Sequence, residues 1–233
     1  MQGIPCLIID PQGDLASLAL SREGGEEFQK IEKIIFTPGS SKGIPLCVNP
    51  LGLPKTKDKE EVIHILQSQA DSICQLIGYK PETEKGKSAQ ALLYLILQDC
   101  YEKGRKIKSF NELAKIVVNL PESVKEKADF FKERELTQLA RELRYLTIGE
   151  KRLLFDFGVP LSMELLLKPN QISIIYLNSL KSMQEKIFFL SVLATKLYEW
   201  MLEHPSQKLQ AIFLIDEISS YLPAGALKPA TKP

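Results

Sequence analysis

The chain has 233 residues, of which 44% are hydrophobic and 25% are charged. This composition supports a soluble core and argues against wholesale disorder, and the length fits one large α/β domain or one domain with a sizeable insertion. The 30 basic and 29 acidic residues leave a net charge of +1. The protein as a whole therefore has no basic field that attracts nucleic acid.

The cysteines and histidines are scattered along the chain. They are Cys6, Cys47, Cys74 and Cys100, without a C-x-x-C pair, and the distant His64 and His204. This spacing argues against a zinc site and a disulfide framework, so we expect packing cysteines and a reducing, cytoplasmic location. No apolar run approaches the ~18 residues of a membrane span, and no signal peptide opens the chain.

The N-terminal part predicts a buried strand and a turn. Cys6–Ile9 is a continuous apolar run, which is typical of a strand buried on both faces. The run Asp10-Pro11-Gln12-Gly13-Asp14 follows. It fits a plain turn in which Asp14 caps a helix over Leu15–Ser21, or a loop that places Asp10 and Gln12 beside a bound nucleotide. A weaker apolar run at 34–36 predicts a further strand.

The middle of the chain has a helical pattern throughout. Helices are predicted over 58–77, 87–103, 109–118 and 122–145. Ser109 with Glu112 three residues later fits a capping box. The last helix is rich in charges of both signs, which we interpret as a solvated face. Residues 58–147 therefore predict a helical subdomain inserted into an α/β sheet formed by 1–57 and 148–233.

The C-terminal part predicts a βαβ crossover. Ile172–Leu177 and Ala211–Ile215 have the apolar character of strands buried on both faces. Between them, Ser182–Glu203 has apolar residues at helical spacing and ends before His204-Pro205. Such a unit connects parallel strands, and its crossover is expected to be right-handed.

Polar side chains mark the carboxyl ends of the three strong apolar runs. They are Asp10, Asn178 and the pair Asp216-Glu217. Ligands of open parallel sheets bind beyond the carboxyl ends of the strands, so these residues point to one common edge. Mg²⁺ takes one or two carboxylates together with water and phosphate oxygens, which fits Asp216. Glu217 fits a base that orients and deprotonates an attacking water.

One segment resembles the end of a phosphate-binding loop but lacks the rest of that motif. Gly86-Lys87-Ser88 has the ending of G-x-x-x-x-G-K-[ST], but Pro81 stands where the first glycine belongs. The preceding segment Lys80–Lys85 is polar and opens a helix, whereas a phosphate cradle needs a strand, a glycine-rich loop and a helix together. We therefore reject this motif.

Several segments resemble HerA-type ATPases of the FtsK/HerA superfamily. Residues 2–14 are similar to the strand that follows the P-loop helix in that family. Ile212–Glu217 and the residues up to Pro223 resemble its Walker B strand and the loop after it, and Ile172–Trp200 resembles the preceding strand and helix. The helical block 58–147 matches the position of the family's insertion.

The resemblance implies a parallel sheet of the P-loop NTPase (ASCE, RecA-like) type, with ATP and Mg²⁺ as cofactors. It also implies a homo-hexameric ring that moves or unwinds double-stranded DNA together with a repair nuclease. Carried over to this sequence, Asp216 holds Mg²⁺ through water and Glu217 polarises the attacking water. Asp10 and Gln12 lie next to the phosphate site.

The sequence also departs from the family's pattern. The family's glycine-rich loop lies upstream of the strand at Cys6–Ile9, and its sensor strand and arginine finger lie downstream of the Walker B region; this sequence has none of them. We expect an incomplete ATPase core that lacks both ends and has negligible ATPase activity alone. Two alternatives remain open: a conjugation or secretion coupling ATPase, and a degenerate, non-hydrolysing interaction module.

Overall fold

A computed structural model describes residues 3–21, 25–128, 131–217 and 221. In this part of the chain, six parallel strands form one sheet in the order β4-β3-β2-β5-β1-β6. The strands are β1 (Cys6–Asp10), β2 (Glu32–Pro38), β3 (Ile44–Cys47), β4 (Val159–Pro160), β5 (Gln171–Tyr176) and β6 (Ile212–Ile215). The predicted α/β class with a parallel sheet is confirmed.

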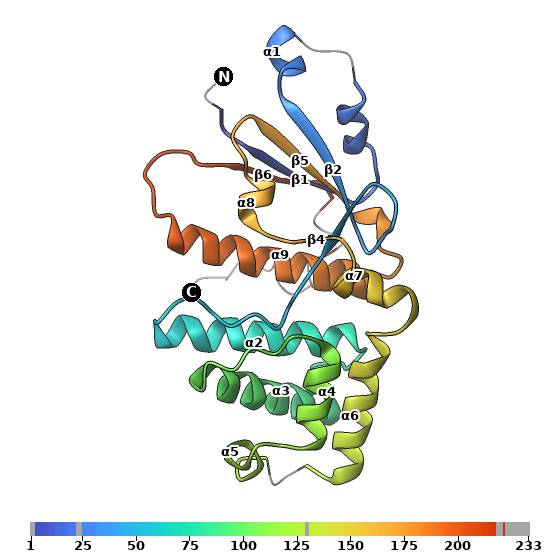
Figure 1. The fold of residues 1–233 in the computed structure, drawn as a ribbon, viewed down its shortest axis with the longest axis vertical. Coiled ribbons are helices and arrows are strands. Elements are labelled where there is room, and N and C mark those ends of the chain that lie inside the picture. The colour runs from blue at the N-terminus through green and yellow to red at the C-terminus, as the bar shows by residue number, and fades with distance from the viewer. Residues whose placement is uncertain (1–2, 22–24, 129–130, 218–220, 222–233) are drawn as a thin grey trace, which may run out of the picture.

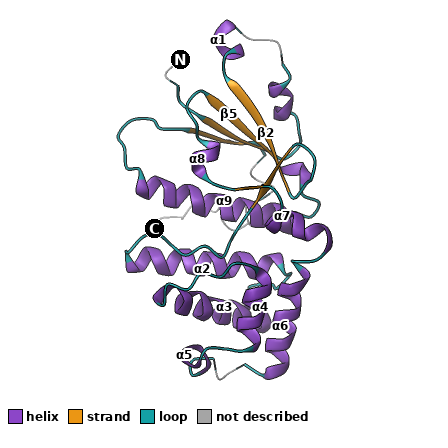
Figure 2. Ribbon diagram, in the orientation of Figure 1, coloured by secondary structure: helices purple, strands orange, loops and turns teal. Residues whose placement is uncertain are grey.

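The long helices stack on one side of this sheet (Figures 1 and 2). The α-helices are α1 (Glu26–Gln29), α2 (Lys59–Leu76), α3 (Glu84–Glu102), α4 (Phe110–Val118), α5 (Glu122–Lys125), α6 (Glu133–Tyr145), α7 (Arg152–Asp156), α8 (Met163–Leu166) and α9 (Met183–Glu203). Short 3₁₀ helices are η1 (Leu15–Ala19), η2 (Gly149–Lys151) and η3 (Leu177–Ser179). None of the helices within the described ranges is both long and apolar enough to cross a membrane.

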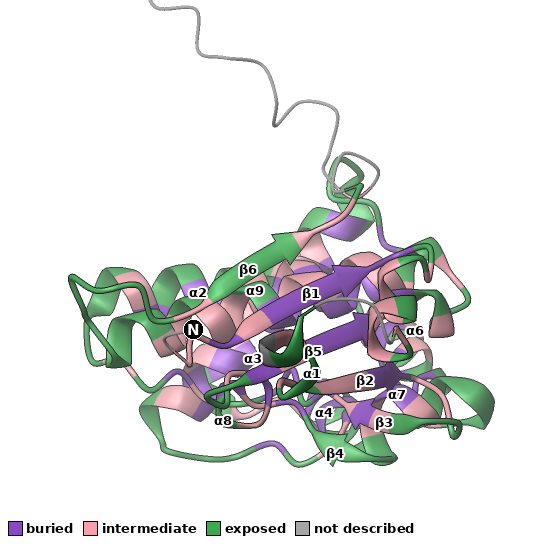
Figure 3. Ribbon diagram, turned by 90° about the horizontal axis from the view of Figure 1, so that it is seen from above, coloured by how far each residue is buried: buried purple, intermediate pink, exposed green. Residues whose placement is uncertain are grey.

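Strands β1 and β5 form the buried centre of the sheet (Figure 3). Their residues pair in register, with Ile8 opposite Ile174 and Ile9 opposite Ile175. All four of these isoleucines are buried, as the continuous apolar runs predicted for strands covered on both faces.

Strand β6 differs from its prediction, because it is not buried. It pairs with β1 and lies at the edge of the sheet, and Ile212, Phe213 and Leu214 are 40–46% exposed. The prediction used apolar character alone, which reports a strand's preference for burial. Position in the sheet decides whether other elements cover both of its faces. Figure 3 shows this contrast between β6 and β1.

Two strands at the opposite edge were not predicted. β3 contains Pro45, and β4 ends at Pro160 after two residues. Proline cannot donate to a ladder and is confined to strand edges and ends, so neither segment has the signal of a central strand. β2 was predicted as 34–36 and extends over seven residues.

Helix α9 confirms the helix predicted over Ser182–Glu203. Ser182 caps it by accepting from the Glu185 N–H, and the Glu185 carboxylate accepts from the Ser182 N–H. Phe188, Phe189 and neighbouring apolar residues are buried. Figure 1 shows α9 between the sheet and α2, so α9 packs against α2 on the side away from the sheet.

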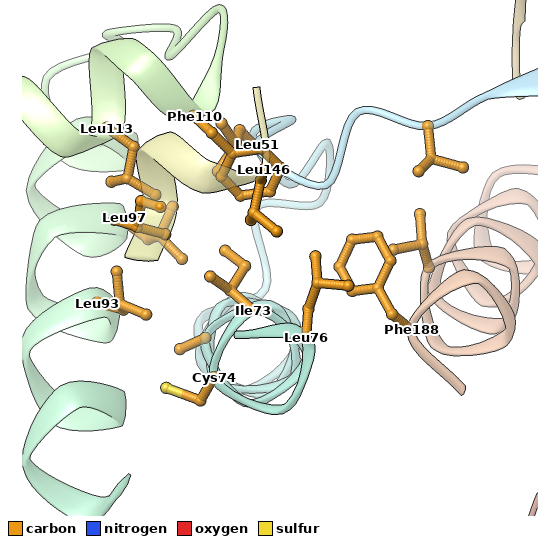
Figure 4. Close-up of a cluster of buried hydrophobic side chains, with 14 of the residues drawn as sticks. Leu51, Ile73, Cys74, Leu76, Leu93, Leu97, Phe110, Leu113, Leu146 and Phe188 are labelled. Atoms are coloured by element: carbon orange, nitrogen blue, oxygen red, sulfur yellow. The ribbon is translucent and has the colours of Figure 1, made fainter. Parts of the chain in front are cut away.

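The helices between β3 and β4 share one apolar core with the sheet layer. Leu93 and Leu97 of α3 and Leu113 of α4 point to the same interior as Ile73 of α2 (Figure 4). Leu76 of α2 faces Phe188 of α9 in the same view, so this core is continuous with the layer against the sheet. Three of these helices begin at capping side chains, which are Asp58, Thr83 and Ser109.

The capping box predicted at α4 forms only in part. Ser109 accepts from the Glu112 N–H at 3.3 Å, as predicted. The Glu112 carboxylate accepts from the Lys108 N–H at 2.9 Å rather than from Ser109. The return bond is therefore made one residue earlier than the motif requires.

The single helix predicted over 122–145 is wrong. The described residues form α5 and α6 as separate helices, and residues 129–130 lie outside the description. Val124 and Ala128 are buried at helical spacing, so the burial pattern by itself does not mark the end of α5. Helix α6 begins after Lys132, whose backbone N–H donates to the Glu135 carboxylate at 2.9 Å and is thereby satisfied at the helix start.

The cysteines are free thiols, and two of them are core residues. Cys74 and Cys100 are buried, whereas Cys6 and Cys47 are half-buried. Burial and the charge of Asp71 raise the pKa of the Cys74 thiol to about 12. Such a thiol is inert and acts as a small apolar side chain.

Candidate functional site

The carboxyl ends of β1 and β6 lie side by side at one edge of the sheet. Ile9 pairs with Ile215 in the parallel register, so Asp10 and Asp216 leave adjacent strands at the same level. The Asp216 N–H donates to the Ile9 carbonyl at 3.2 Å and extends the ladder by one bond. The structure therefore brings together the two acidic segments that the sequence placed at a common edge.

The Asp10 side chain organises the turn that follows β1. It is 0% exposed, and its two oxygens accept from the Gly13 and Ala16 N–H groups, each at 2.6 Å. Asp14 makes no side-chain cap bond to η1, so the capping role considered for Asp14 belongs to Asp10. The segment after it is a 3₁₀ helix over Leu15–Ala19, shorter than the predicted 15–21.

Tyr176 supports the same turn and was missed by sequence reasoning. It is the last residue of β5 and pairs with Asp10 in register. Gly13 has φ +102°, and a Cβ there would lie 2.9 Å from the Tyr176 ring. Glycine is thus required both for the backbone angle and for the close approach of the ring. An aromatic residue at the end of β5, at the predicted edge, was the available signal.

Gln12 and Glu217 meet across this edge although 205 positions separate them. The Gln12 Nε2 donates to the Glu217 Oε2 at 2.6 Å. Glu217 has φ +46°, a left-handed backbone conformation that is uncommon outside glycine and asparagine. The contact connects the turn after β1 with the tip of β6.

Asp216 presents a half-buried carboxylate next to this contact. Among the residues that the structure describes, its carboxylate makes no side-chain hydrogen bond or ion pair. Tyr221 lies close by, and its burial together with the Glu217 charge raises the pKa of its phenol. The remainder of the predicted loop, 218–220 and 222–223, lies outside the described residues.

These residues fit a magnesium ion only in part. No group of three or more His, Cys, Asp or Glu side chains gathers within the described ranges. Mg²⁺ does not need such a cage, because it binds through one or two carboxylates, water and substrate phosphates. Asp216 fits this role, because its carboxylate oxygens make no hydrogen bond or ion pair among the described residues. Asp10 does not fit as a direct ligand in this conformation, because backbone N–H groups occupy both of its oxygens.

Two other predicted features lie apart from this contact. Asn178 follows β5 at the same edge, where its amide oxygen accepts from Lys186 of α9 at 3.2 Å. Gly86 lies in the first turn of α3, and its N–H donates to the Thr83 hydroxyl at 3.0 Å. The Gly86 N–H therefore serves a helix cap, in agreement with the rejection of this motif as a phosphate cradle.

Comparison with known proteins shows a structural likeness but no sequence match. No protein-family model and no curated protein sequence matches the chain. The structure of VirB4 of Thermoanaerobacter pseudethanolicus is similar, with a TM-score of 0.60 and 13% identity over 94% of this chain and 76% of that chain. At this identity the likeness concerns the fold alone, and it shows that the chain shares an α/β fold with that structure.

Proposed function

We propose that this chain carries the metal-binding and water-activating edge of a P-loop ATPase motor. One observation carries the proposal: Asp216 and Glu217 leave β6 beside the Asp10–Gly13 turn of β1, at the carboxyl edge where parallel sheets bind ligands. The fold likeness supports the ATPase class.

The two acidic residues have separate tasks in this proposal. Asp216 would hold Mg²⁺ through a water molecule, since its carboxylate is uncommitted among the described residues. Glu217 would accept a proton from the attacking water at a carboxylate oxygen. Bound Mg-ATP would supply the phosphoryl group and a metal that offsets its negative charge.

This sequence contains no glycine-rich loop after a strand that could hold the β- and γ-phosphates. The Gly13 N–H, which faces the same edge, is already bonded to Asp10. We therefore expect negligible ATP turnover by this polypeptide. Robust turnover that is lost in Glu217→Gln would contradict this expectation.

Two classes of motor are candidates, and they differ in what they move. A HerA-type reading gives a homo-hexamer that moves double-stranded DNA with a repair nuclease. The likeness to VirB4 favours the second reading, a conjugation or secretion coupling ATPase. The near-neutral charge gives no independent support for DNA binding. A degenerate interaction module keeps the fold but needs no metal at Asp216.

Paramagnetic NMR tests the proposed metal edge. Mn²⁺, which replaces Mg²⁺ at oxygen sites, is titrated alone into the ¹⁵N-labelled chain, so that the readout does not depend on bound nucleotide. We expect selective broadening of the amides at the tips of β1 and β6. Asp216→Asn should abolish this broadening, whereas Asp14→Asn should retain it, because Asp14 is exposed on the same turn without a side-chain cap bond.

Two outcomes of this titration would count against a metal at Asp216. Equal broadening in wild type and Asp216→Asn, or broadening centred elsewhere, would reject Asp216 as the metal-binding residue. It would favour the degenerate module over the motor.

A further inference from the structure

The turn after β1 is a fixed base for the Gln12 side chain. On one side of Gln12, Pro11 and Asp10 are buried, and Asp10 holds the backbone of Gly13 and Ala16 through two bonds of 2.6 Å. On the other side, Gly13 lies directly against the Tyr176 ring. Gln12 itself is exposed, so the turn is anchored while this one side chain extends from it.

Glu217 is held in an unfavourable conformation at the other end of the contact. Its φ of +46° puts a long side chain on left-handed backbone, which costs about 1 kcal/mol or more relative to right-handed backbone. The Gln12 Nε2 binds only Oε2, at 2.6 Å. The other oxygen, Oε1, makes no hydrogen bond to the described residues.

We propose that Gln12 is a positioning residue for Glu217. The carboxamide donates to Oε2 and so fixes the plane of the carboxylate, which leaves Oε1 as the oxygen that faces water. This assignment rests on the proposed function, because it gives Glu217 its role as a base. Gln12 touches the base rather than the reacting atoms.

The residue type at position 12 is specific in this arrangement. A glutamine donates to a carboxylate, whereas methionine has a similar length and no donor, and glutamate would place a second negative charge against Glu217. Asparagine is one methylene shorter. Gln12→Met is therefore the variant that removes the bond with the least change in shape.

Side-chain amide NMR on the full chain tests the contact without any need for catalysis. The readout is the exchange with water of the Gln12 Nε2 proton that is donated to Glu217 Oε2. Glu217→Ala should accelerate this exchange about two- to fivefold, as expected when a modest exposed hydrogen bond is lost. Asp14→Ala removes a carboxylate from the same turn and should leave the exchange unchanged. The Glu217 backbone shifts should move in Gln12→Met and remain in place in Asp14→Ala.

The outcomes separate this inference from the proposed function. Gln12 exchange that is equal in wild type and Glu217→Ala overturns the positioning role, even if Mn²⁺ broadening still depends on Asp216. Accelerated exchange together with no Asp216-dependent broadening supports the Gln12–Glu217 contact and rejects the metal edge. If Glu217→Ala does not fold, the Glu217 shifts in Gln12→Met decide: unchanged shifts overturn the positioning role.

Discussion

Removal of the Asp10 carboxylate should strongly destabilise the protein. Asp10 is 0% exposed and accepts two short backbone hydrogen bonds, from Gly13 and Ala16. Asp10→Ala breaks both bonds, leaves two donors unpaired and opens a small cavity. Hydrogen bonds to charged groups contribute about 1.5–3 kcal/mol each, so we expect a loss of about 3–5 kcal/mol in the free energy of unfolding.

Urea denaturation followed by circular dichroism measures this loss, and thermal unfolding gives an independent value. For a chain of this length, the same loss lowers Tm by about 10 °C. The control is Asp14→Ala, which removes an exposed carboxylate from the same turn. It should change the free energy of unfolding by less than about 0.5 kcal/mol.

A cost of less than about 1 kcal/mol for Asp10→Ala would contradict this expectation, since the fully buried carboxylate accepts two short hydrogen bonds. Asp10→Asn sharpens the test. The amide keeps one acceptor oxygen and turns an NH₂ group toward a backbone donor, so its stability should lie between those of wild type and Asp10→Ala.

Other positions give independent tests. Burial would raise the pKa of Asp99, but hydrogen bonds from Lys103 and Ser123 outweigh it and lower the pKa below its ordinary 3.8. The stability advantage of wild type over Asp99→Asn in urea melts should thus be complete at pH 7 and decline as the pH falls below 3.8. A Cβ on Gly158, at φ +111°, would lie 2.4 Å from the Pro45 carbonyl oxygen, whereas Gly104 has open space. Gly158→Ala should cost about 3 kcal/mol and Gly104→Ala about 1 kcal/mol by the same melts. Cys74, with a thiol pKa of about 12, should react with a disulfide reagent at pH 8 only on unfolding.

Apolar runs predicted the sheet's centre well, because burial on both faces leaves a continuous signal. Cys6–Ile9 and Ile172–Leu177 match β1 and β5 to within one residue at each end. The same signal wrongly predicted burial on both faces for β6, whose residues are also apolar but lie exposed at the edge of the sheet. Composition of a strand does not report which strands lie beside it.

The sequence predicted at which edge of the sheet the candidate residues lie, but not which of them contact one another. Parallel strands bring Asp10 and Asp216 to one rim, and this follows from direction alone. The bond between Gln12 and Glu217 depends on the turn geometry that Asp10 and Tyr176 impose. Such geometry comes from tertiary packing, so no local pattern could separate the structural role of Asp10 from direct nucleotide binding.

The central claim is that the tips of β1 and β6 form one metal-binding edge. A crystal structure of the chain with Mn²⁺, read by the anomalous signal of manganese, tests it most directly. We predict a peak about 4–5 Å from the Asp216 carboxylate, the span of a water-mediated contact, on the side of Glu217. A well-occupied manganese peak remote from both carboxylates would contradict the claim.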